Sequence, residues 1–181
     1  MKKVCMIVTD GFEEVEALSV VAILSRGGVQ VDVYSLLDKD ATGRYGVIWP
    51  NLKSFSEMKV NDYEAIVIPA GPGWNAIEAN EDVQNWLKDF NSAGKYLCAI
   101  CAAPTMLGRA GFLKDRNYTC FKKMNDDFGG TYHEQYVVTD GNIITGCSVA
   151  ASIEFAFAIL EAVLGKEVAN KVRADVYYDF K

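Results

Sequence analysis

Cys101 is the residue whose type and position best suit covalent chemistry. The apolar segment 96–100 predicts a buried strand and segment 102–109 predicts a helix, so Cys101 falls on the turn between them. In parallel α/β sheets ligands bind at the carboxyl ends of strands, and the free N–H groups at a helix N-terminus stabilise a thiolate. Small neighbours, Ala99 and Ala102, permit the crowded backbone of a nucleophile elbow. The sequence favours a reactive thiol, and the alternative is one more buried free cysteine.

Glu16 is the first candidate partner for this thiol. It lies in the first predicted helix, where its neighbours at helical spacing include Val20 and Ile23, so it belongs to an apolar stripe. A carboxyl among apolar groups resists ionisation and can donate a hydrogen bond to a thiolate or transfer a proton. The alternative is a solvated position at the edge of the stripe. Glu13 and Glu14, in the first turn, are expected to meet solvent.

The loop 69–73 is the second candidate partner. It follows the predicted strand 65–68 and contains Ala70 and Gly71, next to prolines and a further glycine. Glycine lets the backbone approach a ligand closely, and backbone N–H groups at this sheet edge can hold a developing oxyanion. A plain turn that ends the strand is the alternative reading, because glycine and proline fit it equally well.

The remaining cysteines and the histidine support other chemistry only weakly. Cys98 and Cys101 form a C-x-x-C pair, which is typical of thioredoxin-like redox sites. Side chains three apart on a strand point to opposite faces, so a disulfide between them would need rearrangement. The chain has five cysteines and one histidine, His133, without a second C-x-x-C to complete a zinc site. We therefore expect no metal and no cofactor.

Length, composition and charge limit the classes of protein. The 181 residues, half of them apolar, fit one domain spanning 1–181 with a full hydrophobic core. The formal net charge of −6, without a basic run, argues against nucleic acid and anionic membranes as partners. No apolar stretch approaches the roughly 20 residues of a membrane helix, and the first apolar run is too short for a signal peptide. We expect a cytoplasmic protein.

The elements that must position these residues alternate along the chain. Segment 4–9 predicts a buried strand, and Asp10 with Glu13 predicts a capping box for a helix that ends near Arg26, before two glycines. Segment 30–35 alternates apolar and polar residues and predicts a second strand. Strand, helix and strand within about thirty residues form a βαβ unit, so the sheet should be parallel.

Further elements follow the same alternation. Expected strands are 47–49 at one edge, 65–68, 96–100, and a hairpin of 137–139 with 143–145. Expected helices are 82–91, 102–109, about 150–164, and 166–173. Segment 117–136 carries little signal. The pattern predicts an α/β fold, a three-layer α/β/α sandwich with a mostly parallel sheet.

The turn Ala99-Ile100-Cys101-Ala102-Ala103-Pro104-Thr105 resembles the cysteine elbow of the ThiJ/PfpI superfamily, in the branch of the parkinsonism-associated deglycase and its bacterial relatives. The segments that agree are Asp10-Gly11-Phe12-Glu13-Glu14-Val15-Glu16, Pro69-Ala70-Gly71, Ser152-Ile153-Glu154-Phe155-Ala156 and Gly165-Lys166-Glu167-Val168-Ala169. They cover nearly the whole chain in order, and their combination is specific although each piece alone is weak.

This resemblance implies a flavodoxin-like sandwich and a homodimer. It implies that Cys101 is the nucleophile or an oxidation-sensitive thiol and that Glu16 is the acid that contacts it. It implies that the oxyanion and substrate site comprises the amides near Ala70, Gly71 and Ala102, and Arg44, which resembles an arginine reaching a pocket near the dimer interface.

The sequence also departs from the family. Members with protease or amidase activity carry histidine directly after the cysteine, where this chain has Ala102. Some relatives place a histidine where this chain has Cys120 and Phe121, and His133 lies further along. The segment before the last large helix is usually rich in glycine and proline, whereas here it is Cys147 to Ala151, so the pocket wall there can differ.

Three functions remain open. The first is an enzyme that acts on small reactive carbonyls, such as α-oxoaldehydes, or on their adducts with proteins: Cys101 forms a hemithioacetal and Glu16 moves the proton. The second is a redox sensor or stress-responsive chaperone that works through oxidation of Cys101. The third, intracellular proteolysis or amide hydrolysis, ranks last because Ala102 removes the local Cys-His dyad.

Overall fold

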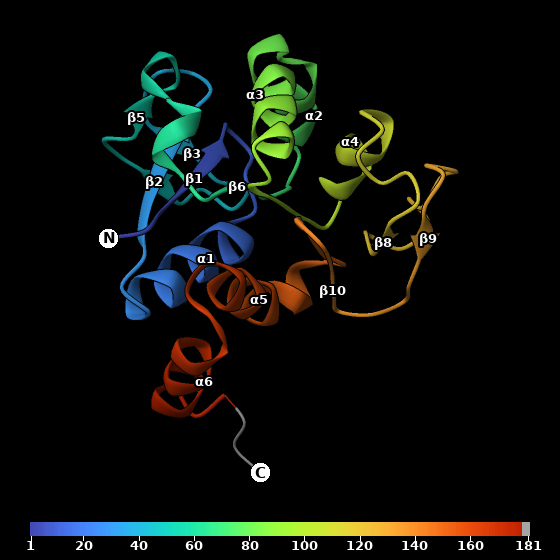
Figure 1. The fold of residues 1–181 in the computed structure, drawn as a ribbon. Coiled ribbons are helices and arrows are strands. Elements are labelled where there is room, and N and C mark those ends of the chain that lie inside the picture. Colours follow the sequence, from blue (N-terminus) through green and yellow to red (C-terminus); the bar gives the residue numbers. More distant parts are fainter. Residues whose placement is uncertain (179–181) are drawn as a thin grey trace.

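A seven-stranded sheet lies at the centre of the computed structural model, which describes residues 1–178 (Figure 1). In spatial order its strands are β10 (Val137–Asp140), β11 (Ile143–Gly146), β7 (Tyr96–Ile100), β6 (Ala65–Ile68), β1 (Lys3–Val8), β2 (Gln30–Ser35) and β5 (Lys53–Ser54). Neighbouring strands run parallel apart from the β10–β11 hairpin. In the central register Val67 pairs with Met6 on one side and with Cys98 on the other.

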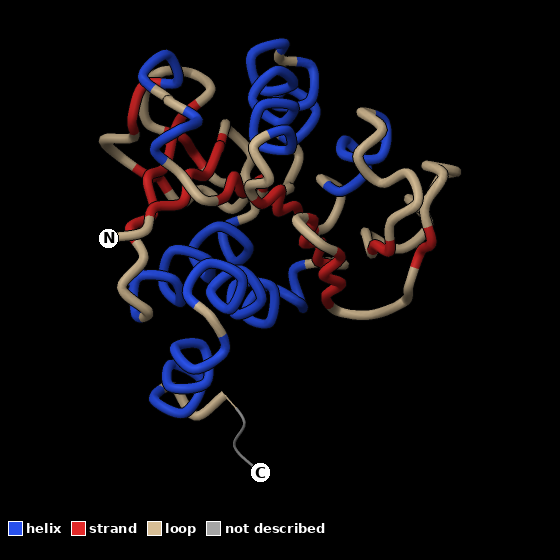
Figure 2. The backbone as a smooth tube through the Cα atoms, in the orientation of Figure 1, coloured by secondary structure: helices blue, strands red, loops and turns tan. Residues whose placement is uncertain are grey.

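Helices cover both faces of this sheet (Figures 1 and 2). Within residues 1–178 they are α1 (Glu14–Arg26), α2 (Trp74–Ala79), α3 (Glu81–Ser92), α4 (Pro104–Arg109), α5 (Ser152–Leu164) and α6 (Lys166–Asp175). Helices α1 and α5 pack together on one face, with α6 against α5, whereas α2, α3 and α4 lie on the other. The predicted three-layer α/β/α sandwich with a mostly parallel, flavodoxin-like sheet is confirmed.

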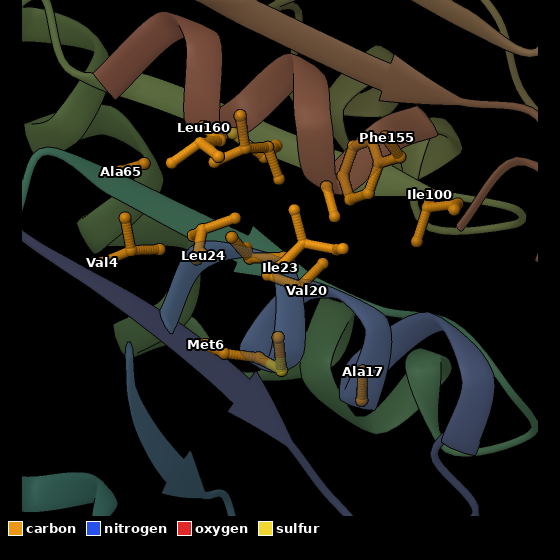
Figure 3. Close-up of a cluster of buried hydrophobic side chains, with 14 of the residues drawn as sticks. Val4, Met6, Ala17, Val20, Ile23, Leu24, Ala65, Ile100, Phe155 and Leu160 are labelled. Carbon is orange, nitrogen blue, oxygen red and sulfur yellow. The ribbon is translucent and has the colours of Figure 1, made fainter. Parts of the chain in front are cut away.

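The sheet is buried because each face carries its own apolar cluster. On one face, alternate residues of β1 such as Val4 and Met6 meet Val20 and Leu24 of α1 and Phe155 of α5 (Figure 3). On the other face the intervening residues of the same strands pack against α3 and α4. Parallel strands buried on both sides read as continuous apolar runs, which is why segments 4–8, 65–68 and 96–100 were recognisable from sequence.

The start of α1 differs from the prediction. Asp10 does not cap the helix: its Oδ1 accepts from the Thr42 N–H at 2.9 Å, and the N-cap position belongs to Glu13 without a side-chain cap bond. The chain turns at Gly11, whose φ is +82°, before the helix begins. The capping box was wrong because Asp10 anchors a second chain segment instead. The predicted helix end is confirmed, with Gly27 as the C-cap.

Four short strands form pairs outside the main sheet. They are β3 (Ala41–Thr42) with β4 (Ile48–Trp49), and β8 (Asn117–Tyr118) with β9 (Thr131–Tyr132). The predicted strand 47–49 therefore pairs in an antiparallel ribbon, and β5, which the sequence analysis missed, forms the sheet edge. In the described part of the chain no helix is long and apolar enough to cross a membrane.

Candidate active site

The candidate site lies where three adjacent strands end. β7, β6 and β1 are neighbours in the sheet and run parallel, so the segments that follow them start at the same edge. Cys101 follows β7, Ala70 lies two residues beyond β6, and Glu16 lies in α1, the helix after β1. The fold thus brings together three segments that are far apart in sequence, as the sequence predicted for the carboxyl ends of parallel strands.

Cys101 has a strained backbone held by two neighbouring segments. Its φ is +63°, in the left-handed region that non-glycine residues seldom adopt. Its N–H donates to the Gly146 carbonyl at 2.9 Å, and its carbonyl accepts from the Phe121 N–H at 2.7 Å. The half-buried side chain contacts the apolar clusters of both faces. These contacts fix the thiol on a sharp turn, which is the geometry of a nucleophile elbow.

Glu16 reaches this thiol from α1 as a buried carboxyl. The residue is 1% exposed, and its Oε2 accepts from the Ala70 N–H at 2.8 Å. Its Oε1 is buried without a partner at full hydrogen-bond geometry among residues 1–178, yet the carboxyl and the Cys101 thiol interact closely enough to shift each other's pKa. Burial raises the pKa of Glu16 to about 7, while the Ala70 N–H and the thiol oppose that rise. The apolar surroundings expected for Glu16 are present.

The thiol of Cys101 is less acidic than the sequence analysis expected. Burial and the nearby Glu16 charge raise its pKa to about 12, and the Ala102 N–H acts in the opposite direction. The expected help from a helix N-terminus is small because α4 starts only at Pro104 and has six residues. A resting thiolate beside an ionised Glu16 is therefore disfavoured.

The two groups hold protons as a pair. While Glu16 is ionised its charge keeps the proton on the Cys101 sulfur, and once Glu16 is protonated that repulsion disappears. Deprotonation of the sulfur is thus coupled to protonation of the carboxyl. With a carboxyl pKa of about 7, Glu16 occurs in both its ionised and its protonated form near neutral pH, so it can accept or donate a proton there.

The amides near the thiol are not equivalent. Ala70 was expected to contribute to an oxyanion site, but its N–H is already donated to Glu16, so it positions the carboxyl instead. The Ala102 N–H lies beside the Cys101 sulfur and stabilises negative charge there. Gly71 has a φ of +93°, and an added Cβ would collide with the Gly11 carbonyl oxygen. Within residues 1–178 no protein group accepts from the Gly71 N–H, so Gly71 and Ala102 remain the candidate oxyanion donors.

Arg44 borders the site through Glu13. Its Nη1 lies 3.2 Å from Oε2 of Glu13, its side chain is partly exposed, and its positive charge lowers the pKa of Glu16. Glu13 and Glu14 were expected to meet solvent, and this was wrong: both are buried. Oε1 of Glu14 accepts from the Tyr45 N–H at 2.7 Å, because the loop between β3 and β4 folds over the start of α1.

The remaining candidates from sequence lie elsewhere. Cys98 is buried in an apolar cluster, burial strongly raises its pKa, and both Cys98 and Cys101 are free thiols. His133 directly follows β9, and its Nε2 is 2.7 Å from Oδ1 of Asn117 in β8. Among residues 1–178 no cluster of three or more histidine, cysteine or acidic residues is arranged to hold a metal ion.

The sequence analysis missed a cavity of about 420 Å³ next to this site. Its lining includes Cys120 and Cys147, two cysteines 27 positions apart, but not Cys101. The signal for it was limited, because segment 117–136 has no clear periodicity and its pairing with the hairpin depends on tertiary packing. The only hint was the unusual segment from Cys147 to Ala151.

Comparisons with known proteins show the family of the chain. A family model described as the DJ-1/PfpI family matches residues 2–162. The chain belongs to the DJ-1/PfpI family. Protein DJ-1alpha of Drosophila melanogaster is 32% identical to it, over 99% of this chain and 86% of the relative. The Parkinson disease protein 7 homolog of Danio rerio is 31% identical, over 96% of this chain and 95% of the relative.

Solved structures of DJ-1 proteins share the fold. The crystal structure of Drosophila melanogaster DJ-1beta superposes with a TM-score of 0.90 at 29% identity, and the match covers 97% of each chain. A Toxoplasma gondii DJ-1 structure, described as oxidized, also gives a TM-score of 0.90 at 27% identity, over 98% of each chain. The chain is thus a DJ-1-type protein, and the ThiJ/PfpI resemblance seen in the sequence is confirmed.

Proposed function

We propose that this DJ-1/PfpI protein is a cofactor-independent enzyme that acts on small reactive carbonyls, such as α-oxoaldehydes, or on their adducts with protein amines and thiols. One observation carries the proposal: a buried carboxyl with a pKa of about 7 interacts with a half-buried thiol on a strained turn. An acid whose pKa matches neutral pH both accepts and donates protons efficiently. The arrangement suits a reaction in which a proton leaves sulfur as a carbon–sulfur bond forms.

The proposed step conserves atoms and charge within the site. Ionised Glu16 accepts the thiol proton while the Cys101 sulfur attacks the aldehyde carbon, and the electron pair of the C=O bond moves to oxygen. The N–H groups of Gly71 and Ala102 stabilise that oxygen as its charge grows. Glu16 then returns the proton to the oxygen, which completes a neutral hemithioacetal. Arg44 lies at the rim, where its charge tunes the pKa of Glu16.

Consumption of methylglyoxal by purified protein tests the proposal. We expect turnover by the wild type and its loss in Cys101→Ser, because a serine hydroxyl in this environment is a far weaker nucleophile. Cys98→Ala is the matched control: it removes a thiol from β7, three residues before Cys101 and buried in the core, and should retain turnover. Equal methylglyoxal consumption by wild type and Cys101→Ser would refute the proposal.

A second candidate function is redox sensing through Cys101, the alternative expected from sequence. It is favoured by the half-buried sulfur beside a carboxyl that can keep its proton and donate to an oxidised sulfur. A related DJ-1 structure is described as oxidized. Mild peroxide followed by mass spectrometry separates the two functions: selective oxidation of Cys101 without carbonyl turnover favours the sensor, and equal oxidation of all five cysteines removes its basis.

We also propose that the protein acts as a homodimer through α1 and the β3–β4 ribbon. Val15 and Leu18 are exposed apolar residues of α1, and Val47 and Ile48 are exposed on the ribbon. Backbone hydrogen bonds join the ribbon to the turn that precedes α1, among them Gly11 N–H to the Thr42 carbonyl at 2.7 Å. This apolar surface borders the site, and a second copy would cover it, consistent with the homodimer that the resemblance implies.

Sedimentation velocity tests the dimer. Leu18→Asp should shift the protein to the monomer, because it places a charge in the middle of the proposed interface. Leu37→Asp is a matched control, since Leu18 is 42% exposed and Leu37 is 40% exposed, but Leu37 belongs to the turn after β2 and not to α1 or the ribbon. A monomeric wild type, or equal behaviour of both variants, would argue against this interface. A cytoplasmic location likewise stays a prediction.

A further inference from the structure

Two thiols share the cavity next to the proposed site. Cys120 and Cys147 both line the space of about 420 Å³. Negative charge on Cys147 contributes to raising the pKa of the Cys120 thiol. Charge on either thiol also raises the pKa of the Tyr132 hydroxyl, and Tyr132 lines the same space. They are therefore close neighbours in the fold, although they come from the loop after β8 and the loop after β11.

The two thiols differ in accessibility. Cys147 is half-buried, with its Sγ 3.6 Å from Oγ of Ser148, whereas Cys120 is 1% exposed and its Sγ–H donates to the Phe121 carbonyl at 3.5 Å. Burial raises the pKa of Cys120 to about 11. A reagent that enters the cavity from solvent thus meets Cys147 first, and Cys120 lies behind it as a second thiol.

The backbones next to these cysteines hold the nucleophile. Gly146, directly before Cys147, accepts from the Cys101 N–H, and Phe121, directly after Cys120, donates to the Cys101 carbonyl. Both bonds act on the residue with the positive φ. A covalent link between the two loops would therefore act on both supports of the Cys101 turn at once.

We propose that Cys120 and Cys147 form a second thiol site that reacts with low-molecular-mass disulfides and closes into an internal disulfide. The Cys147 thiolate attacks one sulfur of the small disulfide and releases a first small thiolate, leaving a mixed disulfide on Cys147. Cys120 gives up its proton to solvent, attacks the Cys147 sulfur and releases a second small thiolate. Two protein thiols lose two electrons together, and the small disulfide gains them.

The size and walls of the cavity fit this class of reagent. A space of about 420 Å³ lies within the usual range of small-molecule pockets. Its mouth carries the exposed rings of Phe121 and Tyr136, which can pack against the alkyl part of a small disulfide, and Lys122 beside Glu134 offers charges of both signs to its polar ends.

Peptide mapping after treatment with oxidised glutathione tests the proposal. Trypsin places the two cysteines on different peptides, 117–122 and 124–166, while Cys98 and Cys101 share the peptide 96–109. We expect a disulfide-linked pair of the peptides 117–122 and 124–166, which dithiothreitol reverses. The link should also form in Cys101→Ser, because that sulfur takes no part in it.

Single variants establish the order of the thiols. Cys120→Ser should accumulate glutathione on Cys147, whereas Cys147→Ser should show neither the link nor a mixed disulfide on Cys120. The coupling to Cys101 predicts that the link changes the iodoacetamide rate of Cys101 by about fivefold or more, and that this change is absent in Cys147→Ser.

Several results would overturn the proposal. One is glutathione attached to Cys101 alone, and another is a link between peptide 96–109 and either cavity peptide without the link between 117–122 and 124–166. Mixed disulfides that persist on Cys120 and Cys147 without closing would also contradict it. None of these outcomes depends on carbonyl turnover, so failure here is separate from failure of the proposed function.

Discussion

The Ala70 N–H donates to Oε2 of Glu16 at 2.8 Å, so the loop after β6 holds a carboxyl that belongs to α1. This bond directs one oxygen of Glu16 toward the loop and leaves the other for the Cys101 side of the site. An amide that the sequence analysis assigned to substrate binding thus holds a carboxyl of the protein itself. The properties of the thiol should therefore be controlled from α1 and from this loop together.

Glu16→Gln should change two reactions of Cys101 in opposite directions. Because the Glu16 charge raises the pKa of the thiol, its removal lowers that pKa, and iodoacetamide alkylation at pH 8 should become faster than in wild type. Methylglyoxal consumption should fall by about 10²-fold or more, because no group remains to carry the proton. Alkylation rates from pH 6 to 10 and a turnover assay measure the two effects.

Glu13→Gln is the control for this variant. Glu13 also raises the pKa of Cys101, but among the causes of that rise it contributes least, and it is paired with Arg44. The alkylation rate of Cys101 should therefore change less in Glu13→Gln than in Glu16→Gln. A slower alkylation in Glu16→Gln at pH 8 would show that the carboxyl assists the thiolate rather than opposing it.

The raised pKa of Glu16 also predicts how stability depends on pH. The folded protein binds the Glu16 proton more tightly than the unfolded chain does. The stability that this proton contributes is therefore fully present below about pH 4.5 and is lost as pH rises through about 7. The loss amounts to about 3 kcal/mol. Urea unfolding of wild type and Glu16→Gln at pH 5 and pH 8 should show the variant gaining relative stability at the higher pH. A difference between the two proteins that does not change with pH would contradict it.

Gly71→Ala should be more damaging than Gly28→Ala. Both glycines have positive φ, +93° and +85°, so both substitutions carry the strain of about 1 kcal/mol or more. Only at Gly71 does the new Cβ collide with backbone, whereas Gly28 has open space. We expect a larger drop in the urea midpoint for Gly71→Ala, with reduced methylglyoxal turnover because the loop that holds Glu16 must move. Equal losses in the two variants would show that the close approach to Gly11 is unimportant.

Arg44→Gln should shift pH dependence more than stability. The Arg44 charge lowers the pKa of Glu16, so its removal should move the Glu16-dependent limb of the turnover profile to higher pH. The ion pair with Glu13 is partly exposed, and its loss should cost about 1 kcal/mol or less. Arg26→Gln, at the far end of α1, serves as the control and should leave the profile in place. A downward shift would contradict the assigned role.

The parts of the site that sequence predicted are those fixed by short-range pattern. Helical periodicity placed Glu16 in an apolar stripe with Val20 and Ile23 but left a solvated edge position open, and the family resemblance indicated the acid that contacts the thiol. The apolar run before Cys101 indicated the strand end in the same way. The resemblance to the family added Arg44, which no periodicity would single out.

The parts that sequence could not predict depend on which segments meet. The sequence predicted Asp10 as a helix cap, but in the structure its carboxylate accepts from the Thr42 N–H. The sequence predicted Ala70 as an oxyanion donor, but its N–H donates to Glu16. The burial of Glu14 follows from the β3–β4 ribbon folding over the helix start, which brings the Tyr45 N–H to it. The Cys120–Cys147 cavity requires two loops to meet, and neither has a regular pattern of its own.

The order of the central strands means that the contact between Glu16 and Cys101 reports when the centre of the sheet has formed during folding. Because β6 lies between β1 and β7, the two side chains can meet only after all three strands have joined the sheet. The contact spans 85 positions of chain, and such distant contacts form late because loop closure must come first. During refolding, the moment at which Cys101 loses its ordinary unfolded-chain reactivity should therefore report completion of the sheet centre. Pulsed alkylation can follow that moment without any added label.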